Sequence, residues 1–389
     1  MATIPQPVAT ESTTGSRIPW YLWCSVLAVT SVTIGSQWDV SWHRSIGRDT
    51  FWTPAHLAIY LCGVLAGIAC GYLILSTTFL RSPDKVANAV HAFGFGGPLG
   101  AFLAAWGGVA MLTSAPFDNW WHNAYGLDVK IVSPPHTLLI LGVVAVEVGS
   151  LFLILAAMNR AENQPVPFRH LQRLFLYIAG LLLMMVMFFM MEFTSDVQLH
   201  MASPYIIASM GVPFCYAVAG NASRHRWAAT WITTLYTAAW IAIILILPLF
   251  PAEPKLGPVF QPVTHLVPPK FPLLLIVPAV LLDLTRLLLR DGSKLLVAIL
   301  SGPIFVLSLV AAEWPFADFL LSKTSQNRFF ATAEFSYGAP SWSAEVSRHF
   351  VRPEHGLMLW KGLGIAILYA AAGTWLGSML GGWMRKIKR

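Results

Sequence analysis

The sequence predicts an all-α integral membrane protein with about ten transmembrane helices, and three observations lead to this. Hydrophobic residues make up 56% of the 389 residues and charged residues only 11%, whereas a soluble domain carries about twice that share of charge. Apolar stretches long enough to cross a bilayer, roughly 20 residues each, recur along the whole chain. Lys and Arg are more frequent in alternate loops between them, as in membrane proteins of fixed orientation.

The apolar stretches give the expected helices in order. They lie at residues 20–37, 54–80, 98–115, 134–158, 171–193, 203–220, 228–250, 272–290, 293–312 and 357–383. The eighth and ninth are the least clearly separated pair. Residues 1–19 are expected to form a disordered cytoplasmic tail, because they are rich in Thr, Ser and Pro and lack the basic start of a signal peptide.

The distribution of Lys and Arg predicts the orientation. With the N-terminus in the cytoplasm, the more basic loops all face the cytoplasm, and so does the C-terminus. We therefore expect both termini to be cytoplasmic, in a bacterial inner membrane. The net charge of +7 then reflects these loops and a C-terminal RKIKR sequence beside anionic lipid headgroups. It calls for no nucleic-acid partner.

One acid-and-histidine pattern occurs twice in the N-terminal half. Asp39-x3-His43-x12-His56 is followed by Asp118-x3-His122-x13-His136. An Asp and a His four residues apart share one face of a helix, and each second histidine follows a proline suited to the first turn of the next helix. Residues 38–56 and 117–136 therefore predict two similar helix–loop–helix hairpins, each with a loop of about fifteen residues by this spacing.

The repeated residues are suitable ligands for a transition metal. Two imidazoles and one carboxylate bind Cu(II), Fe(II) or Zn(II) and leave coordination positions open. Copper binds most tightly in the usual affinity order, with iron and zinc as alternatives. A purely structural role or a proton relay is the competing interpretation. The loops with these residues are expected on the periplasmic side.

Other residues of the repeats are expected to support such a site rather than to form it. Asp49 and Asp128 each follow the first histidine of their repeat by six residues and are candidates to orient its imidazole. Trp42 and Trp121 align between the repeats and would shield a metal or pack at the membrane interface. Asp196 and His200 form a degenerate third copy of the Asp-x3-His pattern.

Acidic residues also occur within or beside the apolar stretches. Buried acids are costly in a membrane and are usually paired or functional. Asp283 has Arg286 three residues further on, which predicts an internal ion pair. Glu147, Glu192 and Glu313 lie in or at the edges of other apolar stretches, and Glu147, well inside the stretch that His136 opens, is a candidate for part of a proton path.

The first repeat resembles the metal-binding segment of the C subunit of particulate methane and ammonia monooxygenases. That family carries Asp-x3-His-x12-His within a similar D-x-x-W-H…R-D-T…T-P-x-H string, and residues 39–56 read DVSWHRSIGRDTFWTPAH. The family's neighbouring site has Asn-x3-His-x13-His, the spacing found at residues 118–136. The resemblance covers roughly residues 20–160, and reaches residue 250 if the hydrophobic layout is counted.

The resemblance implies a copper-dependent membrane monooxygenase, or a subunit of one, that oxidises a small apolar substrate with dioxygen. It implies one copper ion at Asp39, His43 and His56, and a second at Asp118, His122 and His136 or one ion shared between alternative positions. It also implies other membrane subunits or a homo-oligomer as partners. Asp118 departs from the family's Asn, and residues 251–389, with a long outer loop at 313–356, extend beyond the family's pattern.

A second class of function remains open from the residues alone. A membrane protein that transports or handles copper or another transition metal without catalysis would also bind metal. It should carry ligands along a path through the bilayer. The sequence MMVMFFMM at residues 184–191 is the one hint of such a path, although Met in apolar segments usually packs.

Overall fold

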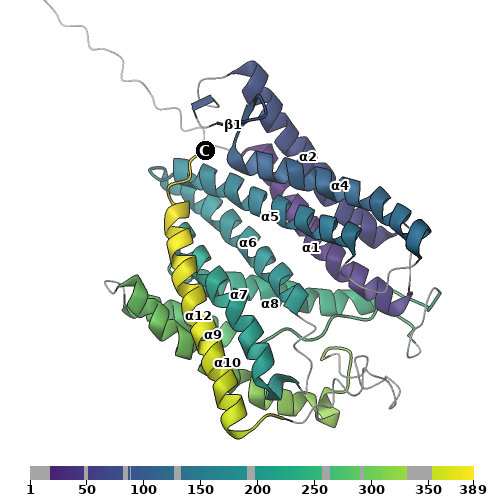
Figure 1. The fold of residues 1–389 in the computed structure, drawn as a ribbon, viewed down its shortest axis with the longest axis vertical. Coiled ribbons are helices and arrows are strands. Elements are labelled where there is room, and N and C mark those ends of the chain that lie inside the picture. The colour runs from purple at the N-terminus through teal and green to yellow at the C-terminus, as the bar shows by residue number, and fades with distance from the viewer. Residues whose placement is uncertain are drawn as a thin grey trace, which may run out of the picture.

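The computed structural model describes residues 18–47, 51–81, 86–87, 89–126, 133–190, 198–255, 263–289, 293–330 and 353–389. Ten long helices dominate these residues (Figure 1). They are α1 (Trp20–Ser45), α2 (Pro54–Leu80), α4 (Leu99–Tyr125), α5 (Pro134–Arg160), α6 (Pro165–Met190), α7 (Ala202–Ser223), α8 (Ala228–Ile246), α9 (Ile276–Leu288), α10 (Lys294–Leu320) and α12 (Gly356–Met384). A small hairpin of β1 (Val90–Ala92) and β2 (Phe95–Gly97) follows α2. The all-α class is therefore confirmed.

Eight of these helices are long and apolar enough to cross a membrane. They are α2, α4, α5, α6, α7, α8 with the following turn, α10 and α12. Each predicted apolar stretch became a helix, but α1 and α9 are not among the eight. α1 ends in polar turns, and α9 has 13 residues, which span only about 20 Å of a hydrocarbon core of about 30 Å. The fold is that of an integral membrane protein.

Three helices run further than their apolar stretches predict. α1 continues to Ser45, α4 to Tyr125 and α10 to Leu320. The prediction that an outer loop begins at residue 313 is therefore wrong, because residues 313–320 continue α10 through Pro315. Polar residues end an apolar stretch without ending a helix, since the backbone hydrogen bonds continue until a cap interrupts them. Residues 331–352 of that loop lie outside the described residues.

Close contacts between glycines join the helices of the N-terminal half. On α4 and α5, Gly107 lies against Gly142 and Gly100 against Gly149, so closely that a Cβ on Gly107 would lie 2.6 Å from the Gly142 carbonyl oxygen. Small residues let helix backbones approach each other where lipid gives no hydrophobic drive to association. Gly108 of α4 meets Gly63 of α2 in the same way, so the α1–α2 and α4–α5 hairpins lie side by side (Figure 1).

The C-terminal helix returns the chain to the end of the bundle where α1 begins. α12 packs along α7 (Figure 1), with Gly377 against the backbone of Phe214. The Asn159 side chain, near the end of α5, donates hydrogen bonds to the carbonyls of Met384 (2.9 Å) and Ile387 (2.7 Å). Ile18 and Arg160 line one small cavity there. The first and last described residues thus share one end, and the C-termini of α1 and α4 point to the other.

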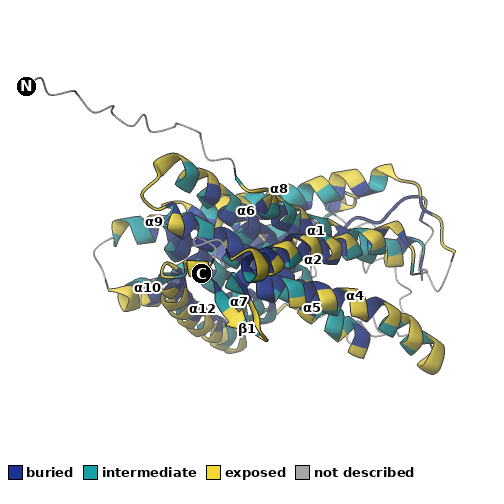
Figure 2. Cartoon of the chain, turned by 90° about the horizontal axis from the view of Figure 1, so that it is seen from above, coloured by how far each residue is buried: buried dark blue, intermediate teal, exposed yellow. Residues whose placement is uncertain are grey.

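The outward faces of the helices are apolar. Exposed residues lie along the outer sides of α4, α10 and α12 while inner faces are buried (Figure 2). The exposed side chains include Trp106, Leu300 and Leu368, which is the composition expected of a surface in contact with lipid. The protein therefore presents a lipid-facing exterior, as a membrane-embedded protein must.

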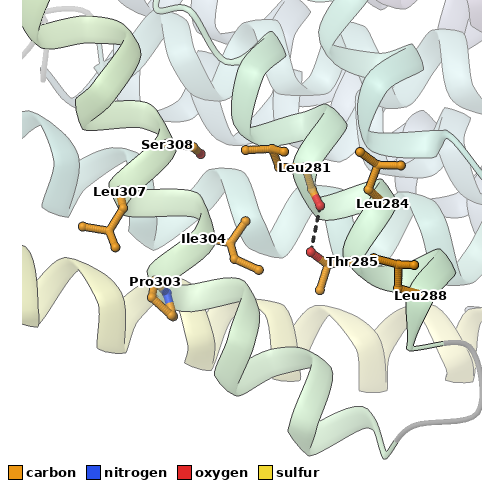
Figure 3. Close-up of a pocket in the computed structure, with 8 residues that line it drawn as sticks. All are labelled: Leu281, Leu284, Thr285, Leu288, Pro303, Ile304, Leu307 and Ser308. Atoms are coloured by element: carbon orange, nitrogen blue, oxygen red, sulfur yellow. Dashed lines mark hydrogen bonds between the residues drawn. The ribbon is translucent and has the colours of Figure 1, made fainter.

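An open groove of about 480 Å³ lies between α9 and α10. Leu281, Leu284 and Leu288 of α9 line it together with Ile304 and Leu307 of α10, and Ile304 lies between the two helices (Figure 3). The Thr285 hydroxyl on its wall donates to the Leu281 carbonyl at 2.8 Å, so its polarity is satisfied within the helix. The groove contains none of the predicted metal ligands, and it belongs to the apolar exterior.

The glycine contacts predict which substitutions disturb the α4–α5 hairpin. Gly107→Ala should destabilise the protein by about 1–3 kcal/mol, because the new methyl group must force the two backbones apart. Gly67→Ala in α2 is the matched control, since its added methyl meets nothing within 4 Å and alanine is the better helix former. Thermal unfolding in detergent measures both. Equal unfolding temperatures for the two variants would contradict the close packing.

Candidate metal centre

The first ligand pair of each repeat lies in the last turns of a helix. Asp39 and His43 occupy α1, and Asp118 and His122 occupy α4. The helices end at the aligned glycines, with Gly47 at φ 92° and Gly126 at φ 85°, a left-handed conformation that glycine adopts without strain. The Gly126 N–H donates to the His122 carbonyl at 3.0 Å. The sequence thus sets where each helix stops, just beyond its Asp-x3-His pair.

The second histidine of each repeat lies in the first turn of the returning helix. The Thr53 hydroxyl accepts a hydrogen bond from the His56 backbone N–H at 3.4 Å, and Pro54 fills the first helical position. Ser133 caps α5 in the same way, accepting from the His136 N–H at 3.4 Å. These are the residues preferred at helix starts. The cap fixes the point at which each imidazole leaves the backbone.

The first set brings its three predicted ligands together. His56 Nε2 lies 3.2 Å from Asp39 Oδ1, and His43 Nε2 lies 3.7 Å from Asp39 Oδ2. Asp39 and His56 are about four-fifths buried, whereas the His43 side chain is 44% exposed. One carboxylate thus lies between two imidazoles contributed by two helices.

The second set repeats this arrangement atom by atom. His136 Nε2 lies 3.5 Å from Asp118 Oδ1, and His122 Nε2 lies 3.3 Å from Asp118 Oδ2. Its side chains are about one quarter to one third exposed. The predicted hairpins are therefore present, although their connections, residues 46–53 and 126–133, are shorter than the predicted fifteen residues because α1 and α4 continue further.

The first set is the more compact. Within the parts of the chain that the structure describes, Asp39, His43 and His56 are the one group of three such donors whose ligand atoms all lie within 4.8 Å of one another. Ligands about 2.1 Å from a tetrahedral metal are about 3.4 Å apart, and the two measured contacts fall on either side of that value. The donor set fits a transition metal ion without large rearrangement.

A buried oxygen in each set provides a second indication of a cation. Asp39 Oδ1 and Asp118 Oδ1 are both buried and make no hydrogen bond, although each contacts a histidine. Leaving a buried acceptor unsatisfied costs about 1–3 kcal/mol. A metal ion or an imidazolium proton between the carboxylate and its histidines would offset that cost. The geometry therefore allows either a metal centre or a paired acid and imidazolium.

Aromatic side chains surround both sets. Trp42 and Trp121 are half-buried one residue before His43 and His122. The Trp121 ring lies 4.5 Å from the Tyr125 ring, and the His56 ring lies 5.9 Å from that of Tyr60. Tyr60 thus gives the His56 imidazole an aromatic neighbour, and the Trp121–Tyr125 pair lies in the same helical turns as His122, consistent with shielding or with interfacial packing.

Several residues predicted to support the sites are placed elsewhere or lie outside the described residues. Asp49, Asp128 and Asp196 lie outside the described residues. His200 is buried at the start of α7, where its Nε2 lies 3.0 Å from Asp318 Oδ1 of α10. It therefore pairs with the C-terminal half, and its contacts give it no part in orienting either repeated set.

Two contacts around these residues could not be predicted from the sequence, because each joins segments that are far apart in the chain. Asp318 is the acid that pairs with His200, 118 positions away. The segment after α8 also folds over the end of α1, where the Val267 N–H donates to the Ser45 hydroxyl at 2.7 Å and the Lys255 N–H donates to the Ile46 carbonyl at 2.9 Å. Nothing in the spacing of these residues signals either contact.

Comparison with protein-family models, with curated proteins and with solved structures finds no match to this chain. The fold and the site thus define a class, an all-α membrane protein with two carboxylate–histidine sets at one end of its bundle. Any more specific assignment depends on the residues themselves.

The helix caps should contribute measurably to the site's framework. Thr53→Ala removes the acceptor for the His56 N–H and should lower stability by about 1 kcal/mol. Thr53→Ser retains the hydroxyl and should stay near the wild type. Denaturant unfolding in detergent micelles distinguishes them. Wild-type stability in the alanine variant would show that the hydroxyl does not cap α2.

Proposed function

We propose that this protein is a copper-binding integral membrane protein, and that it acts as a monooxygenase-like oxidoreductase or as a subunit of one. Its substrate would be a small apolar molecule that partitions into the bilayer, oxidised with dioxygen. Asp39, His43 and His56 would hold one ion, and Asp118, His122 and His136 a second.

The observation that carries the proposal is the repetition of one contact pattern in two hairpins. In each, a helix-end aspartate lies between a histidine four residues later and a histidine in the first turn of the next helix. A single Asp–His pair near a membrane interface is commonplace. Two sets built with equivalent hydroxyl caps, aligned glycines and spacings that differ by one residue favour a shared chemical role over chance packing.

Copper is proposed first because of the donor set. Imidazole nitrogen suits copper, iron and zinc, and copper binds most tightly among them at a given nitrogen and oxygen site. Three protein ligands leave positions open for an exogenous molecule. Iron with the same ligands would also support dioxygen chemistry, and zinc would support activation of water instead.

The chain's own residues would orient and shield the site. Copper, when bound, supplies the redox chemistry with dioxygen. Asp39 and Asp118 would fix the direction of two imidazoles each, while Thr53 and Ser133 hold the second histidines at the helix starts. Trp42 and Trp121 would limit access of water. The exposed edge of His43 leaves a route for small molecules from the end of the bundle.

The protein would have a fixed orientation in the membrane and would act with partner subunits. The basic ends of α5, α7 and α12 would face the cytoplasm and the two metal sets the periplasm of a bacterial inner membrane, following the distribution of Lys and Arg. Other membrane subunits or further copies of this chain are the proposed partners, as the resemblance of the first repeat to a multi-subunit family suggests.

Transport of metal is the weaker alternative. It needs ligands along the membrane path, and the methionines at 184–187 are the main candidates in the sequence. Met184, Met185 and Met187 are all buried in the central hydrophobic core among apolar neighbours. They are therefore accounted for by packing, which removes the specific reason to prefer a transport path.

Metal content of protein purified from membranes tests the proposal. Wild-type protein should carry copper, and His43→Ala/His122→Ala should lose it, because each set then keeps only two ligands. His170→Ala is the matched control, an exposed histidine at the start of α6. Elemental mass spectrometry measures the ratio of metal to protein. Metal unchanged by the double substitution, or absent after copper reconstitution, would rule out the metal centre.

The single variants distinguish two ions from one shared ion. With two ions, His43→Ala and His122→Ala should each remove about half of the bound copper. With one ion in alternative positions, neither single variant should halve the copper. If copper is present, turnover of short hydrocarbons with dioxygen and a reductant should disappear in the double variant. Iron or zinc in place of copper would retain the site and exclude copper chemistry.

A further inference from the structure

A second buried polar system lies in the C-terminal half, away from the repeated sets. Its centre is Glu313, a fully buried acid of α10. One oxygen, Oε1, accepts a hydrogen bond from the Leu274 N–H just before α9. The other, Oε2, is buried and makes no hydrogen bond. A carboxyl group with one satisfied oxygen and one unsatisfied oxygen inside a membrane bundle usually has a functional role.

Two buried tyrosines lie within electrostatic range of Glu313. It interacts electrostatically with Tyr205 of α7 and Tyr236 of α8, and both tyrosines are buried. The Tyr205 hydroxyl donates to the Leu199 carbonyl at 2.6 Å. The Tyr236 hydroxyl lies near the Leu273 backbone without a hydrogen bond of regular geometry. Two incompletely satisfied polar groups thus occupy the same buried region.

The Asp318–His200 pair lies between α10 and the turn before α7, at one end of the bundle. Asp318 lies five residues after Glu313 on α10, and its side chain is 68% exposed. Its partner His200 is 3% exposed and packs edge-on against Trp314, with ring centroids 5.0 Å apart. The His200 Nδ1 atom is buried and makes no hydrogen bond. An exposed acid therefore contacts a buried imidazole that can pass a proton inward.

A line of hydroxyl groups leads from Tyr236 toward the opposite end. Thr230, Thr233 and Tyr236 lie on one face of α8, spaced by three residues, and rise about 9 Å along the helix. The Thr233 hydroxyl donates to the Tyr216 hydroxyl at 2.7 Å. The Thr230 hydroxyl donates to Asp283 at 2.9 Å. The Tyr216 hydroxyl in turn donates to the Leu275 carbonyl at 3.3 Å, so these hydrogen bonds leave α8 sideways and do not join the three side chains directly. Hydroxyl groups both donate and accept, so a proton would pass along this face by rotation of the hydroxyls.

Asp283 ends this line near the basic end of the bundle. It is fully buried, accepts the Thr230 N–H at 2.8 Å, and lies 3.9 Å from Arg286. The predicted Asp283–Arg286 pair is thus present, though at a long distance. The Arg286 side chain is 26% exposed, so this end also reaches the surface.

We propose that α7, α8 and α10 enclose a proton path through the membrane, with Glu313 as the buried carrier. A Glu313 oxygen takes up one proton delivered through Asp318 and His200, and releases it toward Tyr236 and the hydroxyl line that ends at Asp283. Only O–H and N–H bonds form and break, and one proton leaves for each that enters. The path is independent of the proposed metal centre.

A structural role of Glu313 is the main competitor, and one substitution separates the two. Glu313→Gln keeps a carbonyl oxygen to accept the Leu274 N–H but cannot carry a proton. Glu313→Asp retains the acid on a shorter side chain. If Glu313 only anchored the start of α9, the glutamine variant would behave as the wild type.

Proton flux into liposomes tests the path. The full-length protein is reconstituted with a pH-sensitive dye inside, and a potassium diffusion potential drives protons inward. Wild-type protein should acidify the vesicles faster than empty liposomes, and Glu313→Gln should slow this at least about tenfold, while Glu313→Asp retains much of it. Glu253→Gln is the matched control, an exposed acid outside the helices, and should match the wild type.

A second variant keeps the test decisive if Glu313→Gln proves poorly folded by size-exclusion chromatography. Tyr236→Phe keeps the packed ring and removes only the hydroxyl, and should also slow proton entry. Wild-type flux no greater than that of empty liposomes would overturn the proposal. Equal flux in wild type and in both well-folded variants would overturn it as well.

Discussion

The close approach of paired helices is the constraint on which the candidate metal centre depends. On α4 and α5, glycine meets glycine at two levels, so that no side chain separates the backbones. This close approach brings an aspartate at the end of one helix within reach of a histidine in the first turn of the next. On α1 and α2 the contact is between Gly35 and Ile59, where an added Cβ would lie 2.9 Å from the Ile59 side chain. The ligand geometry is therefore a consequence of backbone packing.

The two buried polar systems differ in how they are satisfied. Each repeated set concentrates two imidazoles on one carboxylate, so a single cation or proton would complete it. The C-terminal system spreads its polar groups over α8, α9 and α10, and several atoms, among them Glu313 Oε2 and the Tyr236 hydroxyl, make no hydrogen bond. In a medium without water both are expensive. The first arrangement suits a bound ion, and the second suits a proton that moves.

The sequence predicted the framework of the site but not all of its surroundings. The spacing of Asp39 and His43 placed them on one helical face, and Pro54 and Pro134 marked the starts of the returning helices. It could not show that α1 and α4 continue to Ser45 and Tyr125, because hydropathy measures affinity for lipid and not helical hydrogen bonding. The pairing of His200 with Asp318 joins distant segments and left no local pattern.

By itself the sequence determined the all-α membrane class, the order of the ten helices and the two Asp–His–His sets, since these follow from local composition and short spacings. Tertiary structure alone decided which helices meet, that Glu313 is buried against the Leu274 N–H, and that the segment after α8 covers the end of α1. Those contacts join residues tens to more than two hundred positions apart. Such contacts arise from the packing of the whole bundle, and no short-range periodicity encodes them.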